Sequence, residues 1–121
     1  MYQVHVRRHF DSAHALRGYQ GKCERLHGHR WEIVVCAEAA ELDACGMAFD
    51  FSVLKRELDA VLDELDHRNL NETPPFDHVN PSSEHIARMI FESLQARLPD
   101  ARLRYVEAWE SPDAWATYLP D

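Results

Sequence analysis

Three histidines, His14, His27 and His29, stand in the sequence around a thiol, Cys23. Neutral imidazole nitrogens bind Zn²⁺ well, and a site with three protein ligands keeps a fourth tetrahedral position open for substrate or water. Structural zinc sites instead usually fill all four positions and usually include cysteine. These residue types therefore indicate a catalytic zinc site beside a reactive cysteine.

The spacing of the histidines supports one shared site. Residues two apart on a β-strand point to the same face, so His27 and His29 can both reach one ion. His14, near the end of a neighbouring strand, would supply the third nitrogen. A single histidine is more often a surface or hydrogen-bonded residue, but three together favour a metal site. We interpret the histidines without such neighbours as structural: His5, His9, His78 and His85.

Cys23 lies at the end of a predicted loop, between Lys22 and Arg25. An unpaired cysteine is often an inert, partly buried side chain. Nearby positive charge and a metal would favour its ionised form, which a nucleophile or general base requires. We therefore consider Cys23 a candidate catalytic group.

Two further positions carry carboxylates that could do chemistry. Asp66 adjoins His67 where the apolar periodicity of a helix stops, and such residues are either solvated caps or an acid–imidazole proton relay. Glu110 follows Trp109 at the end of a predicted strand. It is either an acid facing the turn or a carboxylate that accepts two N–H groups from a heterocycle.

Strands and helices must bring these residues together. Alternating apolar residues predict two strands, around Tyr2–Val6 and Trp31–Ala37, joined by a loop over residues 16–26. Two helices follow, one at residues 54–65 with Ser52 as its N-cap and one at residues 82–98. Prolines make residues 71–81 an irregular connection. The last elements are strands at residues 102–109 and 114–119, so the predicted order is ββααββ.

Length and composition limit the function classes. A chain of 121 residues fits a single domain over residues 1–121. The formal net charge of −8 disfavours binding to nucleic acid or to an anionic membrane. Three cysteines without paired spacing, and no leader-like or membrane-spanning apolar run, predict a cytoplasmic protein that is not bound to a membrane.

The ordered motifs resemble those of the 6-pyruvoyltetrahydropterin and 6-carboxytetrahydropterin synthase family over nearly the whole chain. The three residues between Cys23 and His27 match its bacterial 6-carboxytetrahydropterin synthase branch, which serves queuosine (7-deazaguanine) biosynthesis. The last motif differs slightly from the family pattern, because this chain has Glu110-Ser111 where the family usually has Glu-Thr. The motifs that carry the resemblance are FDSAH at 10–14, GKCERLHGH at 21–29, FDF at 49–51 with Leu54-Lys55, LDHRNLN at 65–71, NPSSE at 80–84 and Glu110-Ser111.

The resemblance implies an α+β tunnelling fold (T-fold). In it, an antiparallel four-stranded sheet carries two helices on one face, and subunits assemble into a barrel as trimers that pair into a homohexamer. By the same resemblance, the three histidines bind Zn²⁺, and Cys23 is the catalytic base or nucleophile. Asp66 and His67 form the partner relay, and Glu110 binds the pterin substrate.

The implied activity is that of a lyase. It converts 7,8-dihydroneopterin triphosphate to 6-carboxy-5,6,7,8-tetrahydropterin, with release of acetaldehyde and triphosphate. The nearer alternative is a 6-pyruvoyltetrahydropterin synthase or a related dihydroneopterin side-chain lyase. The more distant one is a noncatalytic, pterin-binding zinc oligomer, which the presence of Cys23, Asp66 and His67 disfavours.

Overall fold

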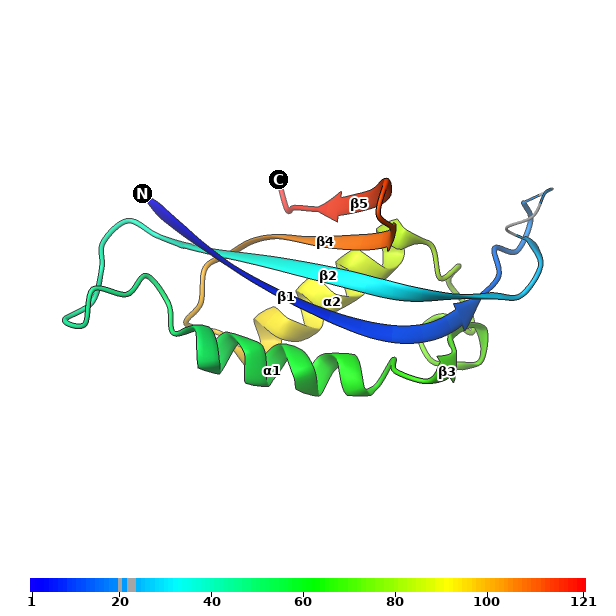
Figure 1. Cartoon of the computed structure of the whole chain (residues 1–121), viewed down its shortest axis with the longest axis horizontal. Coiled ribbons are helices and arrows are strands. Elements are labelled where there is room, and N and C mark those ends of the chain that lie inside the picture. The colour runs from blue at the N-terminus through cyan, green and yellow to red at the C-terminus, as the bar shows by residue number, and fades with distance from the viewer. Residues whose placement is uncertain (20, 22–23) are drawn as a thin grey trace.

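The structure is a computed structural model that describes residues 1–19, 21 and 24–121. Two long strands come first, then two helices with short elements between them, then two more strands (Figure 1). The elements are β1 (Tyr2–His14), β2 (His27–Ala39), α1 (Phe51–Asp63), β3 (Arg68–Asn69), the 3₁₀ turn η2 (Leu70–Glu72), α2 (Ser83–Arg97), β4 (Leu103–Ser111) and β5 (Ala114–Tyr118).

The four long strands form an antiparallel sheet, and the predicted ββααββ order and α+β class are confirmed. The predicted strand count was wrong by one. The sheet has five strands in the order β3-β1-β2-β4-β5, and the additional strand β3 pairs parallel to the end of β1, with Ser12 opposite Arg68. β3 is two residues long, so it leaves no alternating pattern for sequence analysis to detect.

Both helices lie against the sheet, α1 against β1 and α2 against β4 and β5 (Figure 1). Strand alternation explains this arrangement, because every second residue of β2 points into the core. On that face Trp31, Ile33 and Val35 are fully buried. The helices contribute buried residues at helical spacing: Leu54, Leu58, Val61 and Leu62 from α1, and Ile86, Ile90 and Leu94 from α2.

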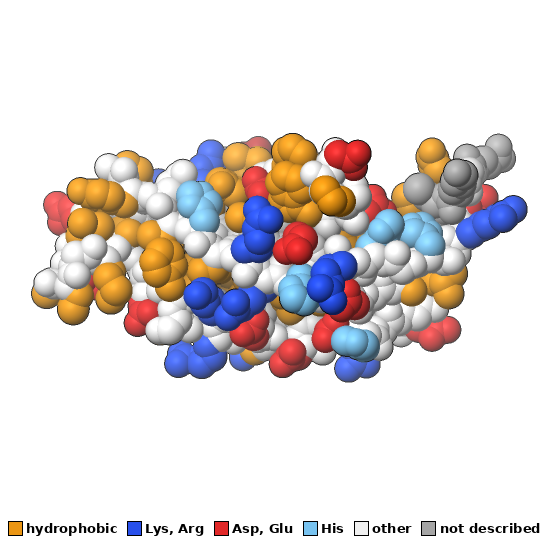
Figure 2. Space-filling model, viewed as in Figure 1, with side chains coloured by type: hydrophobic (Ala, Val, Ile, Leu, Met, Phe, Trp, Pro, Cys, Tyr) orange, Lys and Arg blue, Asp and Glu red, His pale blue; other side chains and the backbone are white. Residues whose placement is uncertain are grey.

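No helix of the described residues covers the opposite face of the sheet, where polar side chains lie among hydrophobic ones (Figure 2). Its exposed residues on β1 include His5, Arg7 and His9, which alternate with the core-facing residues. Acidic and basic groups are interspersed on this face (Figure 2). Within the described part of the chain, no helix is long and apolar enough to cross a membrane.

The start of α1 differs from the prediction. Asp50, not Ser52, is the N-cap, because its carboxylate accepts hydrogen bonds from the Ser52 backbone N–H at 2.9 Å and the Ser52 hydroxyl at 2.6 Å. These bonds hold the pKa of Asp50 below its usual value, and the bond from the Ser52 hydroxyl has the larger effect. Asp and Ser are both good N-caps, so the sequence offered two candidates at this helix start.

The start of α2 gives a prediction about stability. Ser82 caps this helix, with its hydroxyl accepting a hydrogen bond from the His85 backbone N–H at 3.2 Å. We expect Ser82→Ala to lower the free energy of unfolding by about 1 kcal/mol, the usual effect of losing a serine cap. Urea unfolding measures it, with Ser83→Ala as the control inside the helix. Equal losses in the two variants would contradict the capping role.

Candidate metal centre and active site

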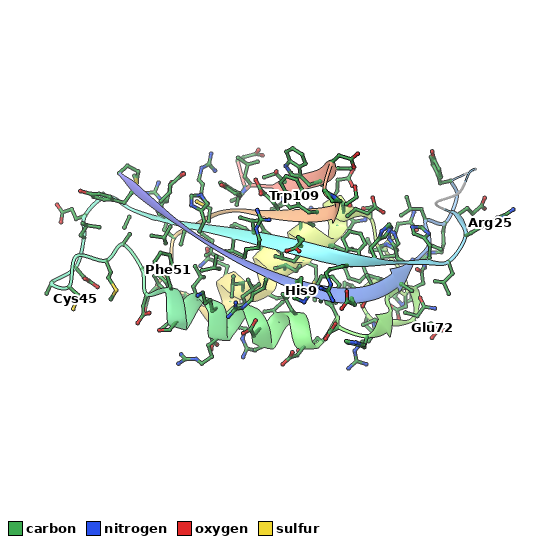
Figure 3. The ribbon with its side chains drawn as sticks, in the orientation of Figure 1. His9, Arg25, Cys45, Phe51, Glu72 and Trp109 are labelled. Carbon is green, nitrogen blue, oxygen red and sulfur yellow. The ribbon has the colours of Figure 1, made fainter. Side chains whose placement is uncertain are left out.

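The three histidines meet at the end of the sheet where β1 finishes and β2 begins. His14 is the last residue of β1 and pairs directly with His27, the first residue of β2, while His29 pairs with Ser12. The ring centroids lie 4.6 Å apart for His14 and His27, 4.7 Å for His27 and His29, and 5.2 Å for His14 and His29. The labelled residues Arg25 and Glu72 mark this end of the molecule in Figure 3.

Backbone carbonyls orient two of the rings. Nδ1 of His14 lies 2.6 Å from the Pro81 carbonyl oxygen, and Nδ1 of His27 lies 2.6 Å from that of Arg25. A carbonyl only accepts hydrogen bonds, so each Nδ1 carries the proton and donates it. The Nε2 lone pair of each neutral ring is then free to bind a metal, which is the usual arrangement of metal-binding histidines.

Glu110 is the fourth member of this cluster. One of its oxygens, Oε1, lies 3.0 Å from His29 Nε2 and 3.1 Å from His14 Nε2. Ligand atoms of His14, His27, His29 and Glu110 all lie within 4.8 Å of one another. Sequence analysis assigned Glu110 to pterin binding, and it gave no sign that this carboxylate also contacts the histidines.

The surroundings of His29 favour its neutral form. Burial lowers the pKa of His29, although the neighbouring Glu110 carboxylate acts in the opposite direction. The Trp31 ring packs edge-on against His14 and His29, with centroids at 4.9 and 5.4 Å. His29 Nε2 is buried and has no hydrogen-bond partner among the residues that the structure describes, even with Glu110 nearby. Three imidazole nitrogens and a carboxylate within 4.8 Å of one another form a group that can hold a metal ion.

Asp66 and His67 form a second group, as the sequence suggested. His67 Nδ1 lies 2.9 Å from Asp66 Oδ2, and the other Asp66 oxygen accepts the Asp11 backbone N–H at 2.9 Å. That backbone bond is the main reason why the pKa of Asp66 is lower than usual. His67 adopts a positive φ of 55° and donates its own N–H to the Asp11 carbonyl. The pair is thus fixed to the edge of β1.

Asp11 and Arg30 were missed by sequence analysis. They pair directly across β1 and β2, and Arg30 Nε lies 3.0 Å from Asp11 Oδ1. The guanidinium of Arg30 lowers the pKa of Asp11. Opposite charges at facing strand positions are a common source of cross-strand pairing, so the strand register, once known, would have revealed this pair.

A cavity of about 490 Å³ opens beside Glu110, on the face of the sheet that carries no helix. Trp109, which Figure 3 labels, contributes to its wall. The cavity is large enough to hold a small heterocycle. Its lining residues are Arg7, Arg30, Glu32, Trp109, Glu110, Ser111 and Pro112.

Cys23, the predicted catalytic base or nucleophile, lies outside the described residues. The structure therefore places six of the seven predicted site residues, and it gathers them in two groups. The first group is the three histidines with Glu110, and the second is Asp66 with His67 beside Asp11.

Comparison with known proteins identifies the family. The model of the 6-pyruvoyl tetrahydropterin synthase family matches residues 3–121. The chain belongs to this family. It is 39% identical to 6-carboxy-5,6,7,8-tetrahydropterin synthase of Synechocystis over 116 residues, which cover 91% of this chain and 87% of the relative. It is 40% identical to dihydroneopterin monophosphate aldolase of Pyrococcus furiosus over 109 residues, 89% of each chain.

A solved structure supports the same conclusion. 6-pyruvoyl tetrahydropterin synthase of Caenorhabditis elegans superposes with a TM-score of 0.85 at 32% identity, covering 100% of this chain and 98% of that one. The predicted family and the T-fold are thereby confirmed, as is the prediction of a 6-carboxytetrahydropterin synthase-like enzyme.

Proposed function

We propose that this protein is a zinc-dependent lyase that converts 7,8-dihydroneopterin triphosphate to 6-carboxy-5,6,7,8-tetrahydropterin, releasing acetaldehyde and triphosphate. The single observation that carries the proposal is the histidine cluster, whose ring nitrogens converge with a carboxylate in a member of a pterin-processing family. The substrate follows from the similarity to the Synechocystis synthase and from the interval between Cys23 and His27.

The proposed metal ligands are His14, His27 and His29. When bound there, Zn²⁺ would supply Lewis-acid polarisation of the side-chain hydroxyl oxygens of the substrate. The protein's contribution is orientation, because the Pro81 and Arg25 carbonyls fix two of the rings with their lone pairs toward the cluster.

Proton transfer is the proposed role of Cys23, Asp66 and His67. In His67, Nδ1 is held by the Asp66 carboxylate, so Nε2 remains to exchange a proton with the substrate. The Asp66 carboxylate is in turn oriented by the Asp11 N–H. This is the arrangement of an acid–imidazole relay, in which the carboxylate fixes the tautomer and orientation of the ring. Cys23 would take one proton from the substrate, and the Asp66–His67 pair would move another.

Glu110 is the proposed pterin contact. Its carboxylate can accept two parallel N–H groups from the guanidine-like edge of the ring, a charge-assisted and directional arrangement. The carboxylate lies beside the histidines, so a ring bound there would have its side chain close to the proposed metal ligands.

We also propose an oligomer, with trimers pairing into a hexamer, in the cytoplasm and in the queuosine pathway. Two observations support assembly. β5 is at one edge of the sheet, and at the other edge β3 pairs only with Ser12 and Ala13 of β1. Within the described residues, most of β1 and all of β5 therefore offer an unpaired edge that barrel closure between subunits would protect.

The Pyrococcus relative favours a second candidate, the cleavage of dihydroneopterin monophosphate. An aldol cleavage would leave the phosphate on the small aldehyde fragment and would release neither acetaldehyde nor triphosphate. The 6-pyruvoyl reaction is a third possibility within the family, and it would keep the side-chain carbons attached to the ring.

Product analysis distinguishes these reactions. The purified protein is incubated in parallel with 7,8-dihydroneopterin triphosphate and with the monophosphate, and the products are identified by mass spectrometry. We expect 6-carboxytetrahydropterin, acetaldehyde and triphosphate from the first substrate. A 6-pyruvoyl product, or turnover of the monophosphate alone, would overturn the proposal.

A further inference from the structure

Glu110 is the residue that the metal cluster and the cavity share among the described residues. It extends the series of core-facing residues on β4, after the fully buried Val106 and Ala108. Strand alternation therefore places its carboxylate on the same face as the three histidine rings. Its side chain is 29% exposed, so it is neither buried in the core nor free in solvent.

The contacts of this carboxylate fit a metal ligand better than a hydrogen-bond acceptor. Nδ1 of His14 donates its proton to the Pro81 carbonyl, so a neutral His14 ring would have no proton at Nε2 for Glu110 Oε1, which lies 3.1 Å away. His29 Nε2 makes no hydrogen bond to Glu110 either, although the two atoms are 3.0 Å apart. Such close approach between acceptor atoms is what a shared cation would stabilise.

The two short distances from Glu110 fit ligation of a shared zinc ion. Zinc bonds to nitrogen and carboxylate oxygen of about 2.0–2.1 Å correspond to about 3.3 Å between ligand atoms in a tetrahedron. Glu110 Oε1 lies 3.0 and 3.1 Å from two of the histidine Nε2 atoms, slightly inside that value. Three imidazoles and a carboxylate would fill all four positions.

We propose that Glu110 is the fourth zinc ligand in the substrate-free protein and that its carboxylate leaves the metal when it takes the pterin edge. The ligand role needs only the metal site, while the exchange rests on the proposed function. The metal position would then open only after a pterin ring is seated. Hydroxylated molecules without the ring would not compete for it.

The exchange would also change the charge at the metal. With three neutral imidazoles and one carboxylate, the site has a net charge of +1, and it returns to +2 when the carboxylate moves to the ring. The larger charge polarises a bound hydroxyl more strongly. A single side chain would thus couple ring recognition to activation of the substrate.

Metal binding without substrate tests the ligand role. We compare wild type with Glu110→Gln and Glu110→Ala, measuring zinc Kd by competition with a chelator and the visible absorption of the Co²⁺-loaded proteins. Loss of a ligand should raise the zinc Kd at least as much as loss of a second-sphere partner does, about 10- to 100-fold. It should also change the Co²⁺ spectrum. Wild-type values in both variants would overturn the ligand role.

Glu107→Gln is the matched control. Glu107 is on the same strand but points to the opposite face, where it accepts a hydrogen bond from Trp109 Nε1 at 3.0 Å. We expect its zinc Kd and Co²⁺ spectrum to equal those of wild type. A change as large as that of Glu110→Gln would overturn the proposal, because it would reflect strand charge rather than ligation.

The exchange is tested with a pterin ring that lacks the hydroxylated side chain, 6-methylpterin. Added to the Co²⁺-loaded wild type, it should change the spectrum by removing the carboxylate, and it should leave the spectrum of Glu110→Ala unchanged. An unchanged wild-type spectrum at saturating pterin would overturn the exchange. Failure of the product assay alongside a changed zinc Kd in Glu110→Ala would refute the proposed reaction and leave the ligand role standing.

Discussion

A protein carrying His27→Ala is expected to lose zinc and turnover together. His27 supplies one of three nitrogens that converge on one point, and its ring is already oriented by the Arg25 carbonyl. Removing a second-sphere partner of a zinc ligand costs about 10- to 100-fold in affinity, and removing the ligand itself should cost more. Zinc content per chain after dialysis, together with the rate of product formation, measures both effects.

The control for this variant is His78→Ala. The His78 side chain is 88% exposed and lies outside the cluster, so its loss should change neither zinc content nor rate. Circular dichroism of both variants establishes that each is folded. A folded His27→Ala protein with one zinc per chain and wild-type turnover would refute the site of three histidines.

The histidine cluster could be predicted because it depends on local rules. The alternation of a strand places His27 and His29 on one face, whatever the rest of the fold does. The contribution of His14 required only that β1 and β2 form a hairpin, which the intervening loop suggested. The register that pairs His14 with His27 keeps the apolar residues of both strands on the core face.

The position of Glu110 could not be predicted in the same way. β4 pairs with β2 only after the chain has passed through both helices, and such long-range pairing leaves no local pattern. The sequence showed that Glu110 ends a strand but not which strand lies beside it. β3 could not be predicted for the same reason. Its long-range pairing with β1 brings the Asp66–His67 pair to the edge of the sheet.

Cys23→Ala is expected to leave zinc content unchanged and to reduce turnover about 10²- to 10⁴-fold, the usual contribution of a general acid or base. The thiol is proposed to act on a proton in the transition state rather than on the metal. Its loss should therefore lower kcat and kcat/KM together, with the zinc Kd unaltered. Single-turnover kinetics and zinc analysis on one preparation measure these quantities side by side.

Cys45→Ala provides the matched control, since Cys45 is an exposed free cysteine outside both groups of site residues. It should keep wild-type turnover and zinc content. Full turnover in Cys23→Ala would refute the catalytic role of the thiol. Loss of zinc from Cys23→Ala would refute it in another way, because the sulfur would then be a ligand. Cys23 would in that case compete with Glu110 for the fourth position, so the two variants together decide which group closes the site.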